Sequence, residues 1–296
     1  TTFLHPQPRK QTKMNILGIS RGTKFSPNLA NSDAAIFATV VEELKGLGHE
    51  VKTIHEDEIL QYDYTPFDRI FTMARDGESL ETLRVELSKE TLQKFINSIA
   101  GALTCTNKSS VAAIMLEAGI PQPNFCNGQK RTLLKSFVEN YNELNVPIWL
   151  KNSDSSAITA DDTIFCQTEE ECRNALLNFE SRGVDTWIAQ EHQKGDLIKF
   201  YGVEGTDFFH WNYASSGHSK FGHEKINGKE KGYRFNAENI KRYADLMAKK
   251  LSVPIYGGDV IIDEEGHFWF IDFNDFPSFS ICRSEAAKAI AERIIQ

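Results

Sequence analysis

The feature that most constrains this chain is a pair of apolar, strand-like segments joined by a short acidic turn near the C-terminal end. Residues 256–279 have the sequence YGGDVIIDEEGHFWFIDFNDFPSF, with turn-forming residues at Glu265 and Gly266. This pattern predicts an antiparallel hairpin with a two-residue loop. We therefore expect the chain to end in antiparallel β structure.

The expected hairpin brings polar side chains together on one face. A two-residue loop places Asp259 directly opposite Asp272, with Cβ atoms about 5 Å apart, and Asn274 shares their face. Facing carboxylates repel each other unless a cation or a raised pKa relieves them. Two Asp and one Asn offer only oxygen ligands, which suit Mg²⁺. The alternative is a three-residue loop with a bulge, which shifts the register and leaves the acids solvated.

The first hundred residues alternate strand and helix patterns. Apolar positions at helical spacing follow Asn31 and Ser32, which can cap a helix that Gly48 ends. This strand, helix, strand order predicts a parallel sheet with crossover helices. The expected strands cover residues 14–20, 50–55 and 67–75, and residues 81–101 are expected to be mostly helical.

After residue 105 the pattern predicts a small α+β unit and then a mostly antiparallel unit. A capped helix in residues 106–118 ends at Gly119, and a second helix opens at Thr168 and closes at Gly183. Strands are expected at residues 147–154, 163–167, 185–192, 198–205 and 208–213, and a helix near residues 237–251. We thus predict an α/β chain of three units, residues 14–105, 106–187 and 188–296.

The segment GGDVIIDEEGHFWFIDFNDFP resembles the closing motif of the ATP-grasp superfamily. In that motif an acid on one strand and an acid-x-Asn on the next hold the magnesium ions of MgATP, which implies that role for Asp259, Asp272 and Asn274. Motifs in the same order cover roughly residues 95–280. The resemblance implies the ATP-grasp fold, with the nucleotide bound between a central lid and the C-terminal unit, and the cofactors ATP and Mg²⁺, with Mn²⁺ as an alternative.

The same resemblance implies the residues that bind the nucleotide. Lys108, before the helix that ends in Gly-Ile-Pro, looks like the first nucleotide lysine, and Lys151 looks like the second. WIAQEHQKGDLIKFYGV resembles the hinge strand of the family, where the adenine, the ribose and the phosphates would be contacted. The hinge residues so implied are Gln190, Glu191, His192, Asp196 and Lys199.

Two of these lysines also stand out without the family. Lys151 and Lys199 lie inside apolar strand runs, IWLKN and LIKFYGV. A buried charge must face a polar partner or a cleft, so neither is expected to be an ordinary surface lysine. Phosphoryl transfer needs such neutralising charges more than it needs covalent help.

The chain departs from the family pattern at its lid and in one metal ligand. After Lys151 it has NSDSSAIT, which lacks glycine. Backbone amides or hydroxyls would therefore have to cover the phosphates. Peptide ligases of the family usually have Glu where this chain has Asp272, and Asp there resembles the inositol phosphate kinases of the same fold. The hydroxyl candidates are Ser153, Ser155, Ser156 and Thr159.

Basic residues are the candidates for binding the second substrate or the transferred phosphate. Arg21 and Arg75 follow strands of the parallel sheet, where open α/β sheets bind ligands, and Arg283 follows the hairpin. Surface salt bridges are the alternative for all three. The loop before the hairpin, where the family usually carries an arginine for the transferred phosphate, offers Lys220, Lys225 and Arg234 instead.

Three histidines lie in or near the same loop. His210, His218 and His223 are spaced through a Gly/Ser/Lys-rich segment. A zinc site is one interpretation. The other is that His218, Lys220 or His223 closes over substrate phosphate.

Composition decides among the remaining functions. The 296 residues include 33 basic and 41 acidic ones, a net charge of -8, and no basic block, which argues against nucleic acid, anionic membranes and polyphosphorylated substrates. Five scattered cysteines indicate reduced thiols and a cytoplasmic protein. Residues 1–13 show no signal peptide, Met14 is a candidate natural start, and homo-oligomer formation stays open.

We therefore expect an ATP-dependent carboxylate-amine ligase that works through an acylphosphate and acts on small-molecule or peptide carboxylate and amine substrates. The alternative is a kinase that transfers the γ-phosphate to a hydroxyl, which Asp272 permits. A nucleotide-binding relative without chemistry is the third interpretation.

Overall fold

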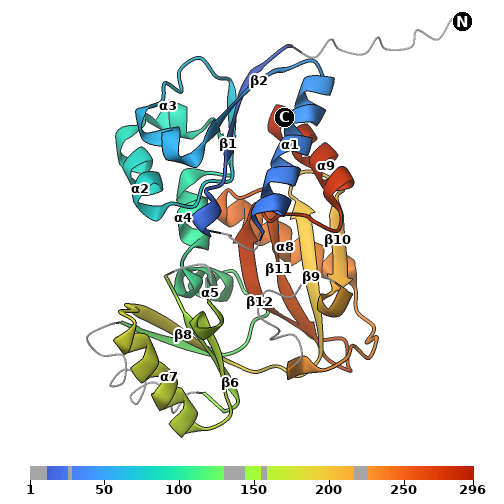
Figure 1. Cartoon of the computed structure of the whole chain (residues 1–296). Coiled ribbons are helices and arrows are strands. Elements are labelled where there is room, and N and C mark those ends of the chain that lie inside the picture. Colours follow the sequence, from blue (N-terminus) through green and yellow to red (C-terminus); the bar gives the residue numbers. More distant parts are fainter. Residues whose placement is uncertain (1–11, 26–28, 130–143, 155–158, 217–225) are drawn as a thin grey trace, which may run out of the picture.

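The computed structural model describes residues 12–25, 29–129, 144–154, 159–216 and 226–296, and these form three four-stranded sheets (Figure 1). The sheets follow one another along the chain. The predicted site residues Ser155, Ser156, His218, Lys220, His223 and Lys225 lie outside the described residues.

The N-terminal sheet is parallel, as predicted, with strand order β2-β1-β3-β4. Leu29 is the N-cap residue of its first helix and makes no side-chain capping bond, so Asn31 and Ser32 lie inside the helix and the predicted caps are wrong. The elements are β1 (Asn15–Ser20), η1 (Thr23–Phe25), α1 (Ala30–Gly46), β2 (Glu50–His55), η2 (Glu56–Gln61) and β3 (Arg69–Thr72).

The region expected to be one helix near residues 81–101 is broken into several elements. The side chains of Ser88 and Ser98 each accept a backbone hydrogen bond at the start of a new helix, and a short strand lies between the two helices. A serine whose side chain accepts a backbone N–H at an N-cap favours the start of a new helix over the continuation of the preceding one. The elements are α2 (Gly77–Glu86), α3 (Lys89–Leu92), β4 (Phe95–Ile96) and α4 (Ile99–Cys105).

The central sheet is antiparallel, with order β5-β8-β6-β7. Thr168 caps its helix, as predicted, and the apolar side of that helix packs with Trp187 and Leu150 in a separate core. The elements are α5 (Lys108–Glu117), β5 (Phe125–Gln129), β6 (Ile148–Asn152), η5 (Ala160–Asp162), β7 (Thr163–Cys166), α7 (Glu169–Ser181) and β8 (Thr186–Glu191).

The C-terminal sheet is also antiparallel, as predicted, with order β10-β9-β11-β12. One face packs against α8 and α5 through Phe200, Tyr256 and Phe270. The elements are β9 (Asp196–Val203), β10 (Phe209–Tyr213), η6 (Ala214–Ser216), α8 (Ala237–Leu251), β11 (Ile255–Ile262), β12 (Phe268–Asp275) and α9 (Arg283–Ile295).

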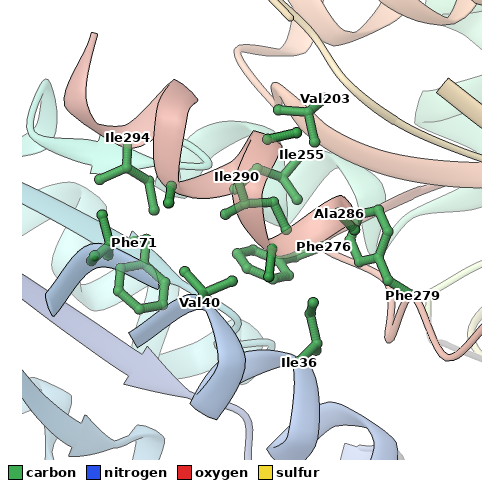
Figure 2. Close-up of a cluster of buried hydrophobic side chains, with 14 of the residues drawn as sticks. Ile36, Val40, Phe71, Val203, Ile255, Phe276, Phe279, Ala286, Ile290 and Ile294 are labelled. Carbon is green, nitrogen blue, oxygen red and sulfur yellow. The ribbon is translucent and has the colours of Figure 1, made fainter. Parts of the chain in front are cut away.

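The last helix returns to the first sheet. Helix α9, which the sequence analysis did not predict, lies beside α1, and Ile290 and Ile294 pack with Val40 and Phe71 in one core (Figure 2). Phe276, which follows β12, is buried in the same core. The N-terminal and C-terminal sheets are therefore joined by a shared core, and the predicted three-unit boundaries stay a prediction.

Among the described residues, no single helix is long and apolar enough to cross a membrane. The pair α4 and α5 meets the length and composition limits only when joined, and the two helices are bent by 104°.

Candidate active site

The hairpin reaches the predicted register by a different route. Asp263 N donates to His267 O at 3.0 Å, and Gly266 has a φ of 84°, so the loop holds three residues and the predicted two-residue loop is wrong. A β-bulge then adds Ile271 to β12 and shifts the register by one residue. Asp259 therefore lies opposite Asp272, as predicted.

The bulge also decides which side chains leave the core. Phe270 and Phe273, three positions apart on β12, are both buried in the core under the sheet. Without the extra residue the period of two would send Asp272 to that face. Gly258 leaves room for this approach, because a Cβ there would lie 2.3 Å from the Asp272 carbonyl oxygen. The opposite face, which carries Asp259 and Asp272, is called the cleft face below.

Lysines surround the two carboxylates. Lys199 is the cross-strand neighbour of Asp259, and its Nζ lies 3.6 Å from Asp259 Oδ1. Lys108, at the start of α5, places its Nζ 3.7 Å from Asp272 Oδ1. Ser153 accepts the backbone N–H of Lys108 at its carbonyl oxygen, at 2.8 Å, so the end of β6 fixes the start of that helix.

Lys151 reaches into the same cleft from the central sheet. Its Nζ donates to Gln190 Oε1 at 2.7 Å and to the carbonyl oxygen of Ile271 at 3.3 Å. The bulge thus provides a backbone acceptor for this lysine. Burial and the nearby charge of Lys108 lower the pKa of Lys151 to about 8, although Asp272 opposes the shift.

Asp272 stays ionised in this setting. Burial would raise the pKa of Asp272, but the charges of Lys108 and Lys151 outweigh it and hold the pKa below its usual value. Asn274 supports the charged form, because its Nδ2 donates to Asp272 Oδ2 at 3.1 Å. The predicted residues Lys108, Lys151, Lys199, Asp259, Asp272 and Asn274 are therefore brought together.

The donor set fits a hard divalent cation. Asp259 and Asp272 face each other, and Asn274 lies on the same face, so the ligand atoms on offer are oxygens. A second acidic group, Asp263, Glu265 and His267, has ligand atoms within 4.8 Å of one another but lies at the hairpin turn, where two of its members are exposed. The sequence analysis did not consider that group.

The predicted hinge residues lie together but already have partners. Glu191 accepts hydrogen bonds from the side chain of Asn124 and the backbone of Asn145, at 2.9 Å each. His192 Nδ1 accepts from Trp149 Nε1 at 3.1 Å, and burial lowers the pKa of His192. A contact of these side chains with adenine stays a prediction.

Asp196, predicted to reach the ribose, is buried and holds a loop. Its two oxygens accept the backbone N–H groups of Lys231, Gly232 and Tyr233 at 2.7 to 2.9 Å. Gly195 beside it is required by close packing, because a Cβ there would lie 2.1 Å from the carbonyl oxygen of Ile262. The ribose contact stays a prediction.

Two hollows flank the hinge. A small cavity of about 20 Å³, the size of one water molecule, is lined by Lys108, Lys151 and Gln190. A larger open groove of about 580 Å³ is lined by His192, Asp196 and Tyr233, among others. Of these two hollows, only the larger groove has the volume to hold a purine.

The two arginines after the parallel strands join the N-terminal sheet to the end of β12. Arg21 donates to the carbonyl oxygens of Met73 and Phe276, at 2.9 Å each, and pairs with Asp33 at 3.2 Å. Arg75 pairs with Asp275 Oδ1 at 3.0 Å. We call these two residues the arginine clamp. Their predicted contact with substrate stays a prediction, because their guanidinium groups already bind protein atoms.

The remaining basic candidates lie apart from one another. Arg283 is the first residue of α9, partly buried, and its Nε has no hydrogen-bond partner among the described residues. Arg234 is exposed, and its carbonyl oxygen is the atom nearest to Gly266, at the turn end of the hairpin. The structure therefore separates Arg234 from the carboxylate pair.

Three parts of the site were missed from the sequence. Ile271 supplies the acceptor for Lys151, and Asp275 is the partner of Arg75. His210 lies on the cleft face of β10, within the strand expected at residues 208–213, although it was grouped above with the histidines of the loop that follows. The three-residue spacing of Phe270 and Phe273 was a usable signal, because it breaks the period of two that a regular strand requires.

Comparison with known proteins adds solved structures of the same architecture. No protein-family model and no curated protein matches the sequence. A D-alanine–D-alanine ligase from Bacillus anthracis, also solved complexed with ATP, is similar over 95% of this chain and 96% of its own, at 15% identity and a TM-score of 0.66.

Two further structures agree. The RimK domain protein ATP-grasp from Sphaerobacter thermophilus matches 95% of this chain and 100% of its own, at 12% identity and a TM-score of 0.66. The D-alanine–D-alanine ligase from Coxiella burnetii matches 96% and 94%, at 12% identity and a TM-score of 0.68. At these identities the likeness is one of fold.

Proposed function

We propose, from the premise that this chain has the ATP-grasp fold, that it is an ATP-dependent ligase that joins a carboxylate to an amine. ATP would phosphorylate the carboxylate, and the amine would then displace phosphate from the acylphosphate, so that ADP, phosphate and an amide are formed. The structural neighbours whose titles name ligases support this class of reaction.

One observation carries the proposal. The facing carboxylates Asp259 and Asp272 share a cleft with three lysines that come from different elements: Lys108, Lys151 and Lys199. Packing alone does not require such a cluster, since a buried lysine with a lowered pKa destabilises the fold. A polyanion bound with a divalent cation explains both signs of charge at once.

Each residue has a role in this proposal. Asp259, Asp272 and Asn274 would hold Mg²⁺, or Mn²⁺, which when bound neutralises phosphate charge. Lys108 and Lys151 would bind the phosphates from the side of the central sheet. Lys199 would lie beside the transferred phosphoryl group and hold the acyl carboxylate near it. Positioning and charge neutralisation then lower the barrier without a covalent enzyme intermediate.

A screen for ADP release tests the proposal. The protein is incubated with ATP, Mg²⁺ and pools of amino acids, small carboxylic acids and polyols, while ADP and free phosphate are followed together. We expect ADP with an equal amount of free phosphate, dependent on both a carboxylate and an amine. ADP without free phosphate, dependent on a polyol, would instead establish the hydroxyl kinase. Nucleotide binding without ADP release would leave the nucleotide-binding relative without chemistry, and absence of both would exclude all three interpretations.

A further inference from the structure

We propose that His210 and Asn212 on strand β10 form the subsite for the amine nucleophile. This inference rests on the proposed ligase and adds to it which strand receives the second substrate. The register of the C-terminal sheet aligns residues in two rows across the cleft face.

The first row connects the carboxylate pair to β10. Asp272 lies opposite Asp259, Asp259 opposite Lys199, and Lys199 opposite Asn212. In the second row Asn274 lies opposite Gly257, Gly257 opposite Tyr201, and Tyr201 opposite His210. Cross-strand neighbours share a face, so β10 places both side chains on the face that carries the metal ligands.

The other face of β10 is occupied by apolar packing. Phe209, Trp211 and Tyr213 pack against the core below the sheet. The alternation of a strand therefore leaves His210 and Asn212 pointing the other way. On that face the His210 ring lies beside the ring of Tyr201, with 6.3 Å between the ring centroids.

The amide of Asn212 has a fixed orientation. Its Nδ2 donates to the carbonyl oxygen of Tyr213 at 2.9 Å, while its Oδ1 is buried and has no hydrogen-bond partner among the described residues. An acceptor oxygen repels phosphate oxygens and binds N–H or O–H donors. The missing partner is therefore a donor, as an amine is, and not the phosphate.

His210 offers a second unpaired atom beside it. Its Nε2 is buried and lacks a partner in the described part of the chain. Buried polar atoms are normally satisfied, so an unpaired one has room for a partner such as a ligand or a water molecule. Strands lie about 4.8 Å apart, so Asn212 is roughly 10 Å from Asp259 across the row. That distance leaves room for an acyl phosphate over Lys199, with the amine beyond it.

The chemical step follows from this placement. The neutral amine, oriented by Asn212 Oδ1, attacks the acyl carbon, so a C–N bond forms. The bond between the acyl carbon and the phosphate oxygen breaks, and phosphate leaves with the electron pair. The proton that the nitrogen loses passes to His210 Nε2 and then to solvent, which makes His210 the general base.

The test separates the two half-reactions. Positional isotope exchange in ATP labelled at the β,γ-bridge is measured with a pool of N-acetylated amino acids and dicarboxylic acids, which contains no free amine. Amide formation is measured with the same pool plus free amino acids. Exchange reports acylphosphate formation alone, so it does not depend on the amine subsite.

We expect Asn212→Leu and His210→Phe to keep isotope exchange within about twofold of wild type and to lose about 10²-fold or more of amide formation. Asn212→Asp keeps an acceptor oxygen but cannot donate to the Tyr213 carbonyl oxygen, so its amide formation should fall less than that of Asn212→Leu without reaching wild type. His210→Gln, whose amide cannot accept a proton, should lose amide formation as His210→Phe does while isotope exchange is kept. Trp211→Phe, which alters the opposite face of the same strand, should leave both measurements near wild type.

Other outcomes would overturn the inference. If exchange falls in step with amide formation, the two residues serve phosphoryl transfer instead. If amide formation is unchanged in both variants, β10 does not bind the amine. Absence of exchange in the wild type would overturn the proposed ligase itself, and the inference with it, so the two failures are distinguishable.

Discussion

The arginine clamp and the lysine cleft, which is formed by Lys108, Lys151 and Lys199 around Asp259 and Asp272, both bury positive charge. They differ in the partners that the charged groups have. Arg21 pairs with Asp33 of α1 and donates across to the Phe276 carbonyl oxygen, while Arg75 pairs with Asp275 of the last sheet. Lys151 has two neutral acceptors and a lowered pKa. Removing a partner from the clamp leaves a buried charge unpaired, whereas the cleft sets three lysines against two carboxylates, and this excess of positive charge favours an anionic ligand.

The largest expected effect tests the cleft side of this comparison. Asp272→Asn keeps the shape of the side chain and removes one charge from the proposed metal site. We expect MgATP-dependent turnover to fall about 10³-fold, because phosphoryl transfer depends on the neutralisation that this site supplies. Turnover is measured as ADP release at saturating ATP.

The control for this variant lies in the same sheet. Asp207→Asn changes an exposed carboxylate in the connection between β9 and β10 and should leave turnover within about twofold. Equal losses in both variants would mean that the sheet needs its carboxylates for folding, as the clamp residues are expected to do.

The clamp side predicts the next largest effect, on stability. Arg75→Met leaves Asp275, which is 1% exposed, without its guanidinium partner. Removing one member of a buried pair costs about 3 to 5 kcal/mol of unfolding free energy. Urea unfolding followed by circular dichroism measures this change.

An exposed pair serves as the reference. Lys13 and Glu50 are 61% and 65% exposed, so Lys13→Met should change stability by less than about 1 kcal/mol. A loss in Arg75→Met no larger than in Lys13→Met would show that the clamp does not hold the two sheets together.

The sequence predicted the cleft better than the clamp, for a physical reason. A lysine inside the apolar strand IWLKN is unusual and can be recognised from the sequence alone, as can the Asp and Asn inside the final strand. Arg21 and Arg75 lie in polar loops, where an arginine is ordinary and gives no such signal. Arg75 pairs with Asp275 at the end of β12, 200 residues away, and Arg21 donates to the Phe276 carbonyl oxygen, 255 residues away. Contacts this distant in sequence form only when the N-terminal and C-terminal sheets pack together.

The hairpin shows a different limit. The facing pair Asp259 and Asp272 was predicted through a two-residue loop, but the chain uses a three-residue loop and a bulge that together restore the same register. Turn residues alone do not fix loop length, since Glu265 and Gly266 suit both loops. The aromatic side chains at 270 and 273 fix the bulge, because both must reach the core.

The third prediction concerns the stability cost of the cleft. Lys151→Met removes a buried charge whose folded pKa, about 8, lies below its unfolded value of 10.5. We expect the variant to be more stable by about 1 to 3 kcal/mol below pH 8, while nucleotide binding is lost. This difference between the two proteins should shrink between pH 8 and 10.5. In that range the unfolded state of the wild type binds more protons than its folded state, so the unfolding free energy of the wild type increases as the pH rises.

Urea unfolding at pH 7 and pH 10 measures that gain in both proteins. Lys241→Met is the matched control, because Lys241 already pairs with Asp245 at 2.6 Å and its loss should not stabilise the chain. If the Lys151→Met protein were less stable than wild type at pH 7, Lys151 would be a charge that the fold needs, as the clamp arginines are expected to be.

The smallest effect is a pH dependence of nucleotide affinity, and it sharpens the comparison most directly. Below pH 8 Lys151 is charged and can pair with phosphate, whereas above pH 8 it must take up a proton when the nucleotide binds. The Kd for MgADP should therefore rise about tenfold for each pH unit above 8. Arg21 and Arg75 cannot produce this slope, since arginine stays charged throughout that range. Calorimetric titration in two buffers of different ionisation enthalpy measures the proton uptake, and a Kd that is flat from pH 7 to pH 9.5 would show that the cleft lysine is held as firmly by protein contacts as the clamp arginines are.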